Sequence, residues 1–367
     1  TLFSDREFLQ ISHDGQIHEI PVTTALPARL NRILTRSQPH NSREKFLQKI
    51  LPRYQSLPTF FPDFSKILEQ KIHARAPDLA RISSFATAKN LALPCPKILY
   101  LHSPIQYFRT HHAAYRQQIP RFLRPIFDAT TQRLRRRDRS PKFQNFQKIF
   151  ANSHATARHA HELYGFDAEI LFPQLTPSTQ NFPTQKFEKK NFFVRIGRIA
   201  NYMRHLDSVL DLAQRQNFEL FIIGDGPDRA ACQRKFSHNA KIHFLGRISD
   251  PTQKLELLAQ ARGSINLCHE SFGLVTAESL RLGTPVFGLD RGATPDLVDP
   301  DSGTLVPDLE PATLDSARSE FSQRARDHTA ISKKFQKKIA THSDRSRVTT
   351  ATHELLTQIP NKKFQKN

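Results

Sequence analysis

The feature that most constrains the fold of this 367-residue chain is a regular alternation of short apolar runs and amphipathic segments after residue 191. The apolar runs predict strands at 192–196, 218–223, 241–244, 264–267, 285–287 and 303–306. The segments between them predict helices at 206–215, 228–236, 252–262 and 275–282. Strands joined to helices by short connections form a parallel sheet with helices on both faces. We therefore expect an α/β domain whose ligands bind beyond the carboxyl ends of the strands.

The first half of the chain also suggests alternating strands and helices, in a less regular form. Strands are expected at 97–102, 148–153 and 168–172, with a helical segment that ends at Tyr164. Residues 175–190 are rich in Pro, Thr, Gln and Lys and lack a core period, which predicts a linker. The expected organisation is a first domain at 1–174, the linker at 175–190, a second domain at 191–331, helices at 332–360 and a basic tail at 361–367.

The connection after the run 264–267 carries two carboxylates, Glu270 and Glu278, around a turn at Phe272 and Gly273. The turn leads into a helix whose first amides have no partner within the helix and can receive an anion. The two carboxylates can accept hydrogen bonds from hydroxyls. An anion together with several hydroxyls describes a sugar nucleotide. The alternative interpretation is an ordinary strand–turn–helix unit with two solvated glutamates.

Six segments of the second half resemble, in order and spacing, the C-terminal half of family 4 glycosyltransferases, the retaining enzymes of the GT-B fold. They are 193–199, 221–227, 244–249, the segment from Glu270 to Glu278, 283–288 and 303–307. Segments 100–108, 151–157 and 164–173 of the first half resemble the mannosyltransferase branch of that family. The resemblance implies two Rossmann-like parallel-sheet domains that face a cleft. It also implies that the last helix returns to the first domain.

The resemblance implies roles for the residues that match the family's motifs, with Glu270, His102 and Arg198 as the catalytic candidates. Glu278 would bind the nucleotide ribose, Glu270 would contact hydroxyls of the donor sugar, and His102 would contact this sugar across the cleft. Arg198 and Arg204 would stabilise the leaving diphosphate, although the family usually places a lysine where Arg204 stands. The other donor-binding residues would be Gly224, Phe272, Gly273, Leu274 and Val275. The alternatives are solvated surface charges for the arginines and a packed or surface histidine for His102.

We therefore predict a retaining hexosyltransferase that moves mannose from GDP-mannose to a glycan or lipid-linked acceptor in cell-surface polysaccharide synthesis. No metal or other cofactor is expected, because the D-x-D sequence at Asp299 to Asp301 lies in a turn before Gly303 and does not end a strand. Two alternatives stay open. One is the same fold with a UDP-sugar donor. The other is a catalytically silent GT-B-like scaffold or a basic nucleic-acid-binding protein.

The net charge of +20 and the isoelectric point near 10.1 indicate polyanionic partners. Basic residues and phenylalanines interleave in the segment 121–148. We expect this segment to contact an anionic membrane, with nucleic-acid contact or a solvated face as alternatives. Its membrane-facing arginines would be Arg133, Arg135, Arg136, Arg137 and Arg139. No RNP, KH or zinc-finger signature occurs, so no specific nucleic acid is expected. Three widely spaced cysteines, no secretory signal and no membrane-spanning run predict a cytoplasmic protein at the membrane surface.

The start of the sequence carries a further expectation. Residue 1 is Thr, and the only methionine is Met203. Members of the family open with a strand and a glycine-rich loop, whereas Thr1 to Asp5 resemble a segment that follows this loop. We expect that the first strand, loop and helix are missing, a unit of about 20–40 residues.

Overall fold

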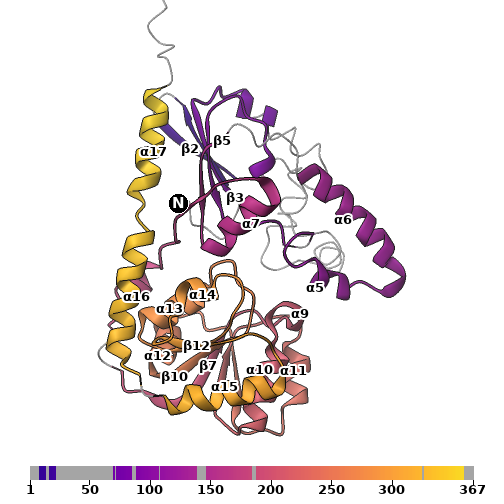
Figure 1. Cartoon of the computed structure of the whole chain (residues 1–367), viewed down its shortest axis with the longest axis vertical. Helices are drawn as coiled ribbons and strands as arrows, with labels where there is room; N and C mark the ends of the chain where they lie inside the picture. Colours follow the sequence, from indigo (N-terminus) through magenta and orange to yellow (C-terminus); the bar gives the residue numbers. More distant parts are fainter. Residues whose placement is uncertain are drawn as a thin grey trace, which may run out of the picture. The chain divides into compact units, whose positions relative to one another are not determined.

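Each of the two units of this chain is built on its own six-stranded sheet, as a computed structural model shows (Figure 1). The first unit comprises Thr1–Asn152, Thr156–Leu171 and Asp344–Asn367, and the second comprises Ser153–Ala155 and Phe172–Ser343. The structure describes residues 8–13, 16–21, 69–70, 72–84, 88–106, 108–138, 146–183, 187–324 and 326–358.

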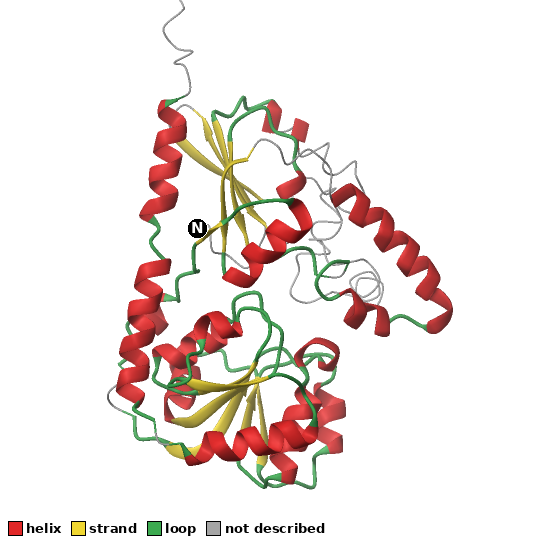
Figure 2. Ribbon diagram, in the orientation of Figure 1, coloured by secondary structure: helices red, strands yellow, loops and turns green. Residues whose placement is uncertain are grey.

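The second unit contains a fully parallel sheet in the order β12-β11-β10-β7-β8-β9. Its strands are β7 (Lys190–Ile196), β8 (Leu220–Ile223), β9 (Ile242–Gly246), β10 (Ala261–Asn266), β11 (Val286–Leu289) and β12 (Gly303–Val306). All six strands predicted from the apolar runs are confirmed. Helices cover both faces of this sheet (Figure 2). Phe193 belongs to one apolar cluster and Phe192 and Val194 to another, because successive strand side chains point to opposite faces.

The helices of the second unit follow the predicted alternation with a few additions. They are α8 (Pro177–Gln180), α9 (Asn201–Arg204), α10 (Leu206–Arg215), α11 (Arg229–Lys235), α12 (Pro251–Gln260), α13 (Leu274–Arg281), α14 (Thr294–Leu297), α15 (Pro311–Gln323) and α16 (His328–His342). Asp250 caps α12 through the Thr252 amide, and Pro251 occupies the first helical position. The prediction of a helix up to residue 262 is wrong, because the backbone becomes extended at Ala261 and starts β10 there.

The segment that was expected to form a linker includes α8. Thr179 and Phe182 are buried, and Phe182 joins the apolar cluster that contains Phe192. The main part of the second unit therefore begins at Phe172, and residues 175–183 belong to this unit.

The first unit contains a mixed sheet in the order β2-β1-β3-β4-β5-β6. Its strands are β1 (Phe8–His13), β2 (Gln16–Pro21), β3 (Leu79–Ser84), β4 (Lys97–Leu101), β5 (Phe146–Ala151) and β6 (Glu169–Ile170). Strands β3 to β6 are parallel, while β1 runs antiparallel to both β2 and β3. The strands predicted at 97–102, 148–153 and 168–172 are confirmed as β4, β5 and the short β6. Residues 1–5, on which the expectation of a missing start was based, lie outside the described residues.

Several helical segments of the first unit lie within the described residues. They are η3 (Ala88–Asn90), α5 (His112–Gln117), η4 (Arg121–Leu123), α6 (Arg124–Asp138), most of α7 (His154–Tyr164) and α17 (Ser346–Thr357). Val348 and Ala351 of α17 pack with Leu79, Ile98 and Tyr100 on the sheet. Among the helices described, none combines the length and the apolar character that a bilayer crossing requires.

Candidate functional site

The carboxyl ends of β7 and β8 approach each other closely at two glycines. Gly197 N donates to Ile223 O of β8 at 2.9 Å, and on the other side of β8 Gly224 N donates to Gly246 O of β9 at 2.7 Å. A Cβ on Gly224 would lie 2.1 Å from Gly197 O, and the φ of Gly224 is +142°. Any side chain at residue 224 would push the two strand ends apart. Gly224 therefore allows the backbones at the ends of β7 and β8 to lie in contact at this edge of the sheet.

Glu270 is fixed by backbone contacts between the loop after β10 and the loop after β11. An isolated parallel bridge joins Glu270 to Gly292, and Ala293 N donates to Glu270 O at 2.9 Å. Gly292 has a φ of +64°, and a Cβ there would lie 2.3 Å from Glu270 O. The glycine permits this close approach, so the sequence after β11 determines where the Glu270 carboxylate lies.

The carboxylate of Glu270 forms an ion pair with Arg204 of α9. Arg204 Nη1 donates to Glu270 Oε1, and both side chains remain partly exposed. Burial opposes the charge of Arg204, but the carboxylate of Glu270 and the sulfur of Cys268 raise the pKa of Arg204 above its ordinary value. The guanidinium therefore keeps its positive charge beside the carboxylate. A diphosphate that bound to Arg204 would compete with Glu270 for this cation.

A row of polar side chains connects the ion pair to the first turn of α13. Arg204 Nη1 contacts Cys268 Sγ at 3.7 Å, and Cys268 Sγ contacts Asn266 Oδ1 at 2.6 Å. Asn266 Nδ2 donates to Thr276 Oγ1 at 2.8 Å. Burial, followed by the charge of Glu270, raises the pKa of Cys268 to about 11, so its thiol is protonated at neutral pH and can donate. The row thus holds the Glu270 loop against the start of α13.

The start of α13 presents backbone amides without a side-chain cap. Its N-cap residue is Gly273, which has a φ of +93°. Phe272 before it is buried, Leu274 is exposed and Val275 is half-buried. The first N–H groups of a helix have no partner within it, and the helix dipole favours an anion there. The expected anion site at Phe272, Gly273, Leu274 and Val275 therefore has suitable backbone geometry.

Glu278 lies on α13 and is buried. Its carboxylate accepts hydrogen bonds from Lys254 Nζ of α12, at 3.0 Å to Oε1 and 2.9 Å to Oε2. A sugar hydroxyl that bound to Glu278 would share or replace these bonds. Lys254 is a site residue that the sequence interpretation missed, since nothing in the sequence relates it to Glu278.

A second missed residue is Arg195, which lies on β7 and is only 2% exposed. Its Nη1 has no hydrogen-bond partner among the described residues. Burial lowers the pKa of Arg195, while Cys268 and Glu270 act to raise it and Arg204 acts to lower it. The available signal was an arginine inside the otherwise apolar run 192–196. Arg198, two residues beyond the end of β7, has an exposed side chain.

The structure thus brings Glu270 and Arg204 into contact and positions both against the start of α13. His102 belongs to the first unit, where it follows β4. Its Nε2 is hydrogen bonded to Ser83 Oγ at 2.8 Å, and its ring packs edge-on against Tyr100. Burial lowers the pKa of His102 to about 4. The imidazole is therefore neutral at pH 7, so it can exchange hydrogen bonds but supplies no positive charge.

Of the five arginines that were expected to face a membrane, the three whose side chains are described do not share one environment on α6. Arg133 and Arg136 are exposed, whereas Arg135 is half-buried and donates from Nε to Phe108 O. The side chain of Arg137 and the whole of Arg139 lie outside the described residues.

The D-x-D sequence lies in a turn, as expected, because Ser302 N and Gly303 N both donate to Asp299 O. Asp299 and Asp301 are paired with lysines of α16, Lys338 and Lys334 respectively. In the part of the chain that the structure describes, no three His, Cys, Asp or Glu side chains form a potential metal site.

The two sheets and their covering helices define the class of fold. The Anabaena protein HepE, solved in complex with UDP, superimposes with a TM-score of 0.56 over 82% of this chain and 84% of its own. The sequences are 16% identical, so this likeness concerns the fold alone. The architecture is that of the GT-B glycosyltransferases, in agreement with the expected fold.

Residues 178–337 match the family model described as “Glycosyl transferases group 1”. This part of the chain, which carries β7 to β12, is a domain of that family. The “O-antigen chain mannosyltransferase C” of Escherichia coli is 28% identical over 138 residues, 36% of this chain and 37% of that protein. The “D-rhamnosyltransferase WbpZ” of Pseudomonas aeruginosa is 25% identical over 232 residues, 60% of this chain and 57% of that protein. The matched part of the chain thus spans 37% of the length of the first relative and 57% of the length of the second.

Proposed function

We propose that this protein is a retaining glycosyltransferase that moves a hexose from a nucleotide sugar to an acceptor. The observation that carries this proposal is the ion pair of Glu270 and Arg204 beside the uncapped start of α13, within the group 1 domain. A cation and a row of backbone amides suit the diphosphate of a sugar nucleotide, and a carboxylate suits its hydroxyls. No metal is required in this mechanism, because the arginines and the helix start supply the positive potential.

The proposed roles follow the chemistry of each side chain. Arg198 and Arg204 stabilise the negative charge that develops on the leaving diphosphate. Glu270 and His102 accept hydrogen bonds from the transferred sugar, and Glu278 accepts bonds from the ribose. When the donor binds, Arg204 turns from Glu270 to the phosphates, which releases the carboxylate for the sugar. Ground-state pairing of the two side chains thus keeps both in place before the donor arrives.

We propose mannose from GDP-mannose as the donor. The support is the name of the E. coli relative, together with the matching segments of the first half. HepE was solved with UDP, which makes a UDP-sugar the principal rival. The proposal is tested by the rise in unfolding temperature that GDP, UDP, ADP and dTDP each produce, since a ligand that binds the folded state alone stabilises it. We expect the largest rise with GDP.

We further propose that the acceptor is a glycan or lipid-linked precursor at an anionic membrane surface, which the protein binds through η4 and α6. Phe122 and Ile126 are 79% and 64% exposed, which leaves two large apolar side chains in water. Arg133 and Arg136 lie farther along the exposed side of α6. Apolar side chains can enter the headgroup region while arginines attract anionic lipids.

Replacing both Phe122 and Ile126 by serine is expected to weaken binding to anionic liposomes by about tenfold or more. The variant lacks the two large apolar side chains whose transfer from water into the membrane is favourable. Liposome co-sedimentation at moderate salt measures this. The matched control is Leu245→Ser, which removes an apolar side chain that is 42% exposed on β9 of the second unit. Equal binding by the wild type and the double variant would rule out this surface as the membrane contact.

A further inference from the structure

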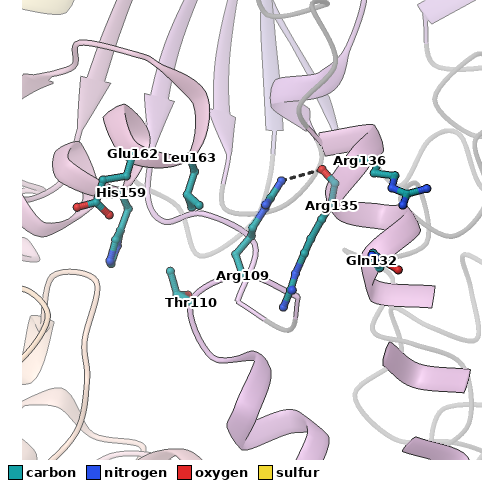
Figure 3. A pocket seen from close by; sticks show the side chains of 8 residues that line it. All are labelled: Arg109, Thr110, Gln132, Arg135, Arg136, His159, Glu162 and Leu163. Atoms are coloured by element: carbon teal, nitrogen blue, oxygen red, sulfur yellow. Dashed lines mark hydrogen bonds between the residues drawn. The ribbon is translucent and has the colours of Figure 1, made fainter. Parts of the chain in front are cut away.

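The first unit contains a polar cavity of about 570 Å³ that has no role in the donor site described above (Figure 3). One wall is formed by Arg109 after β4 and by Arg135 and Arg136 of α6. The facing wall carries His159 and Glu162 of α7 (Figure 3). The cavity therefore gathers three arginines opposite two groups that can form hydrogen bonds with hydroxyls.

Arg109 donates hydrogen bonds to a buried carboxylate and to a backbone carbonyl. Its Nε donates to Asp138 Oδ2 at 3.1 Å, and its Nη2 donates to Arg135 O at 2.8 Å (Figure 3). Asp138 also accepts hydrogen bonds from Lys89 Nζ at 2.5 Å and from Tyr164 Oη at 2.7 Å. Lys89 and Asp138 are fully buried. Two cations thus share one carboxylate, so the base of this wall keeps a net positive charge.

Arg135 and Arg136 add positive charge to the lining of the cavity. Arg135 uses Nε to donate to Phe108 O, which fixes the direction of its guanidinium. The pKa of Arg135 is lowered by burial and then by the nearby charge of Arg109. Arginines close together in a partly desolvated cavity repel one another unless an anion lies between them. The fork geometry of arginine suits the oxygens of a phosphate.

The facing wall suits the hydroxylated part of a molecule that carries a phosphate. Glu162 is exposed on α7, and its carboxylate can accept hydrogen bonds from hydroxyls. His159 is half-buried, and burial lowers its pKa, so its ring is neutral at pH 7 and can also exchange hydrogen bonds with hydroxyls. A carboxylate in this place would repel a bare anion but not the hydroxylated part of a larger molecule.

We propose that this cavity binds the phosphate group of a hydroxylated molecule, with Arg135 and Arg136 on the phosphate and Glu162 on the hydroxyls. The inference rests on the proposed function, because the phosphate then belongs to the acceptor side of the transfer reaction. The phosphate can be carried by a lipid or by a soluble sugar or polyol. Both sources share the chemistry of a phosphomonoester beside hydroxyls.

The soluble probe for this site is glycerol 3-phosphate, with binding measured by calorimetry. We expect saturable binding that becomes at least about tenfold weaker in the double variant R135Q/R136Q, because charge-assisted hydrogen bonds to the phosphate are lost. The matched control is R133Q, which removes the same kind of charge from the same helix outside the cavity and should bind like the wild type. R198Q, in the second unit, should also bind like the wild type.

A second variant tests the site without removing an arginine. Glu162→Gln removes the negative charge from the facing wall, so inorganic phosphate should bind about threefold more tightly or better. This keeps the test informative even where R135Q/R136Q folds poorly. GDP-dependent stabilisation, measured in parallel, should be the same in the wild type, R133Q, R135Q/R136Q and Glu162→Gln, whereas R198Q, which removes a proposed diphosphate ligand, should lower it. If the wild type did not bind GDP, the proposed function would be overturned. The proposal for the cavity is tested separately, by the binding of glycerol 3-phosphate.

Vesicles distinguish the two sources of phosphate. Phosphatidylcholine vesicles that contain phosphatidic acid are compared with vesicles that contain phosphatidylserine at matched surface charge. A preference for phosphatidic acid that R135Q/R136Q abolishes identifies a lipid-borne phosphate, and no preference identifies a soluble carrier. Both results support the site if glycerol 3-phosphate binds as expected. Absence of saturable glycerol 3-phosphate binding, or equal binding by the wild type and R135Q/R136Q, would overturn the proposal.

Discussion

Replacing Glu270 with glutamine is expected to lower turnover by about tenfold to a hundredfold, because a charged hydrogen bond to the donor sugar contributes about 1.5–3 kcal/mol. Nucleotide affinity should stay equal or rise. The reason is the ion pair. Arg204 donates to Glu270 in the absence of a donor, and in the variant this carboxylate no longer competes with the phosphates for Arg204. Initial rates with the donor at saturation measure turnover, and calorimetry with GDP measures affinity.

The matched control for Glu270→Gln is Asp315→Asn, which removes a carboxylate from a surface ion pair with Arg215 in the same unit. A surface pair contributes little, so this control should keep wild-type turnover. Unchanged turnover in Glu270→Gln would remove Glu270 from the catalytic machinery. A loss of GDP affinity equal to the loss of turnover would instead mean that Glu270 binds the nucleotide.

Replacing Glu278 with glutamine should have the opposite profile and weaken GDP binding by about tenfold to a hundredfold. A buried carboxylate that accepts hydrogen bonds from ribose hydroxyls loses its charge in this variant. Lys254 also loses its ion-pair partner, so the unfolding temperature without nucleotide should fall as well. The two effects are separated by titrating GDP at a temperature where both proteins are folded.

Glu256→Gln, on the same helix as Lys254, is the control for Glu278→Gln and should bind GDP like the wild type. If Glu278→Gln kept full GDP affinity while losing only thermal stability, the carboxylate would be a structural partner of Lys254 and not a ribose ligand.

The second sheet was predictable from the sequence because each of its strands is a short apolar run between clear turns. The position of Glu270 and Glu278 around the start of a helix was predictable for the same reason, since Gly273 and the residues around it indicate a turn locally. The two ion pairs were not predictable. Arg204 lies 66 residues before Glu270, and Lys254 lies 24 residues before Glu278, and only the packed sheet brings the members of each pair together.

The first unit was less predictable for two physical reasons. Strand β1 pairs with its sequence neighbour β2 and also with β3, which lies far along the chain, and residue pattern alone identified none of the three strands. The basic segment was interpreted as one charged face, but the helical period of α6 divides it. Thr131, Leu134 and Asp138 are buried on one side, while Arg133 is exposed on the other and Arg135 and Arg136 line a cavity. Arg195 shows the same limit, because a charged residue within a buried strand contradicts the pattern that identifies the strand.

The measurement that tests the central claim most directly is thermal unfolding of the protein without nucleotide and with GDP, UDP, ADP or dTDP at the same concentration. A site that binds GDP should gain about 2.7 kcal/mol of stability at a concentration about a hundredfold above its Kd. We expect GDP to raise the unfolding temperature more than the other nucleotides do. The same unfolding temperature in the absence and presence of all four nucleotides would contradict this expectation.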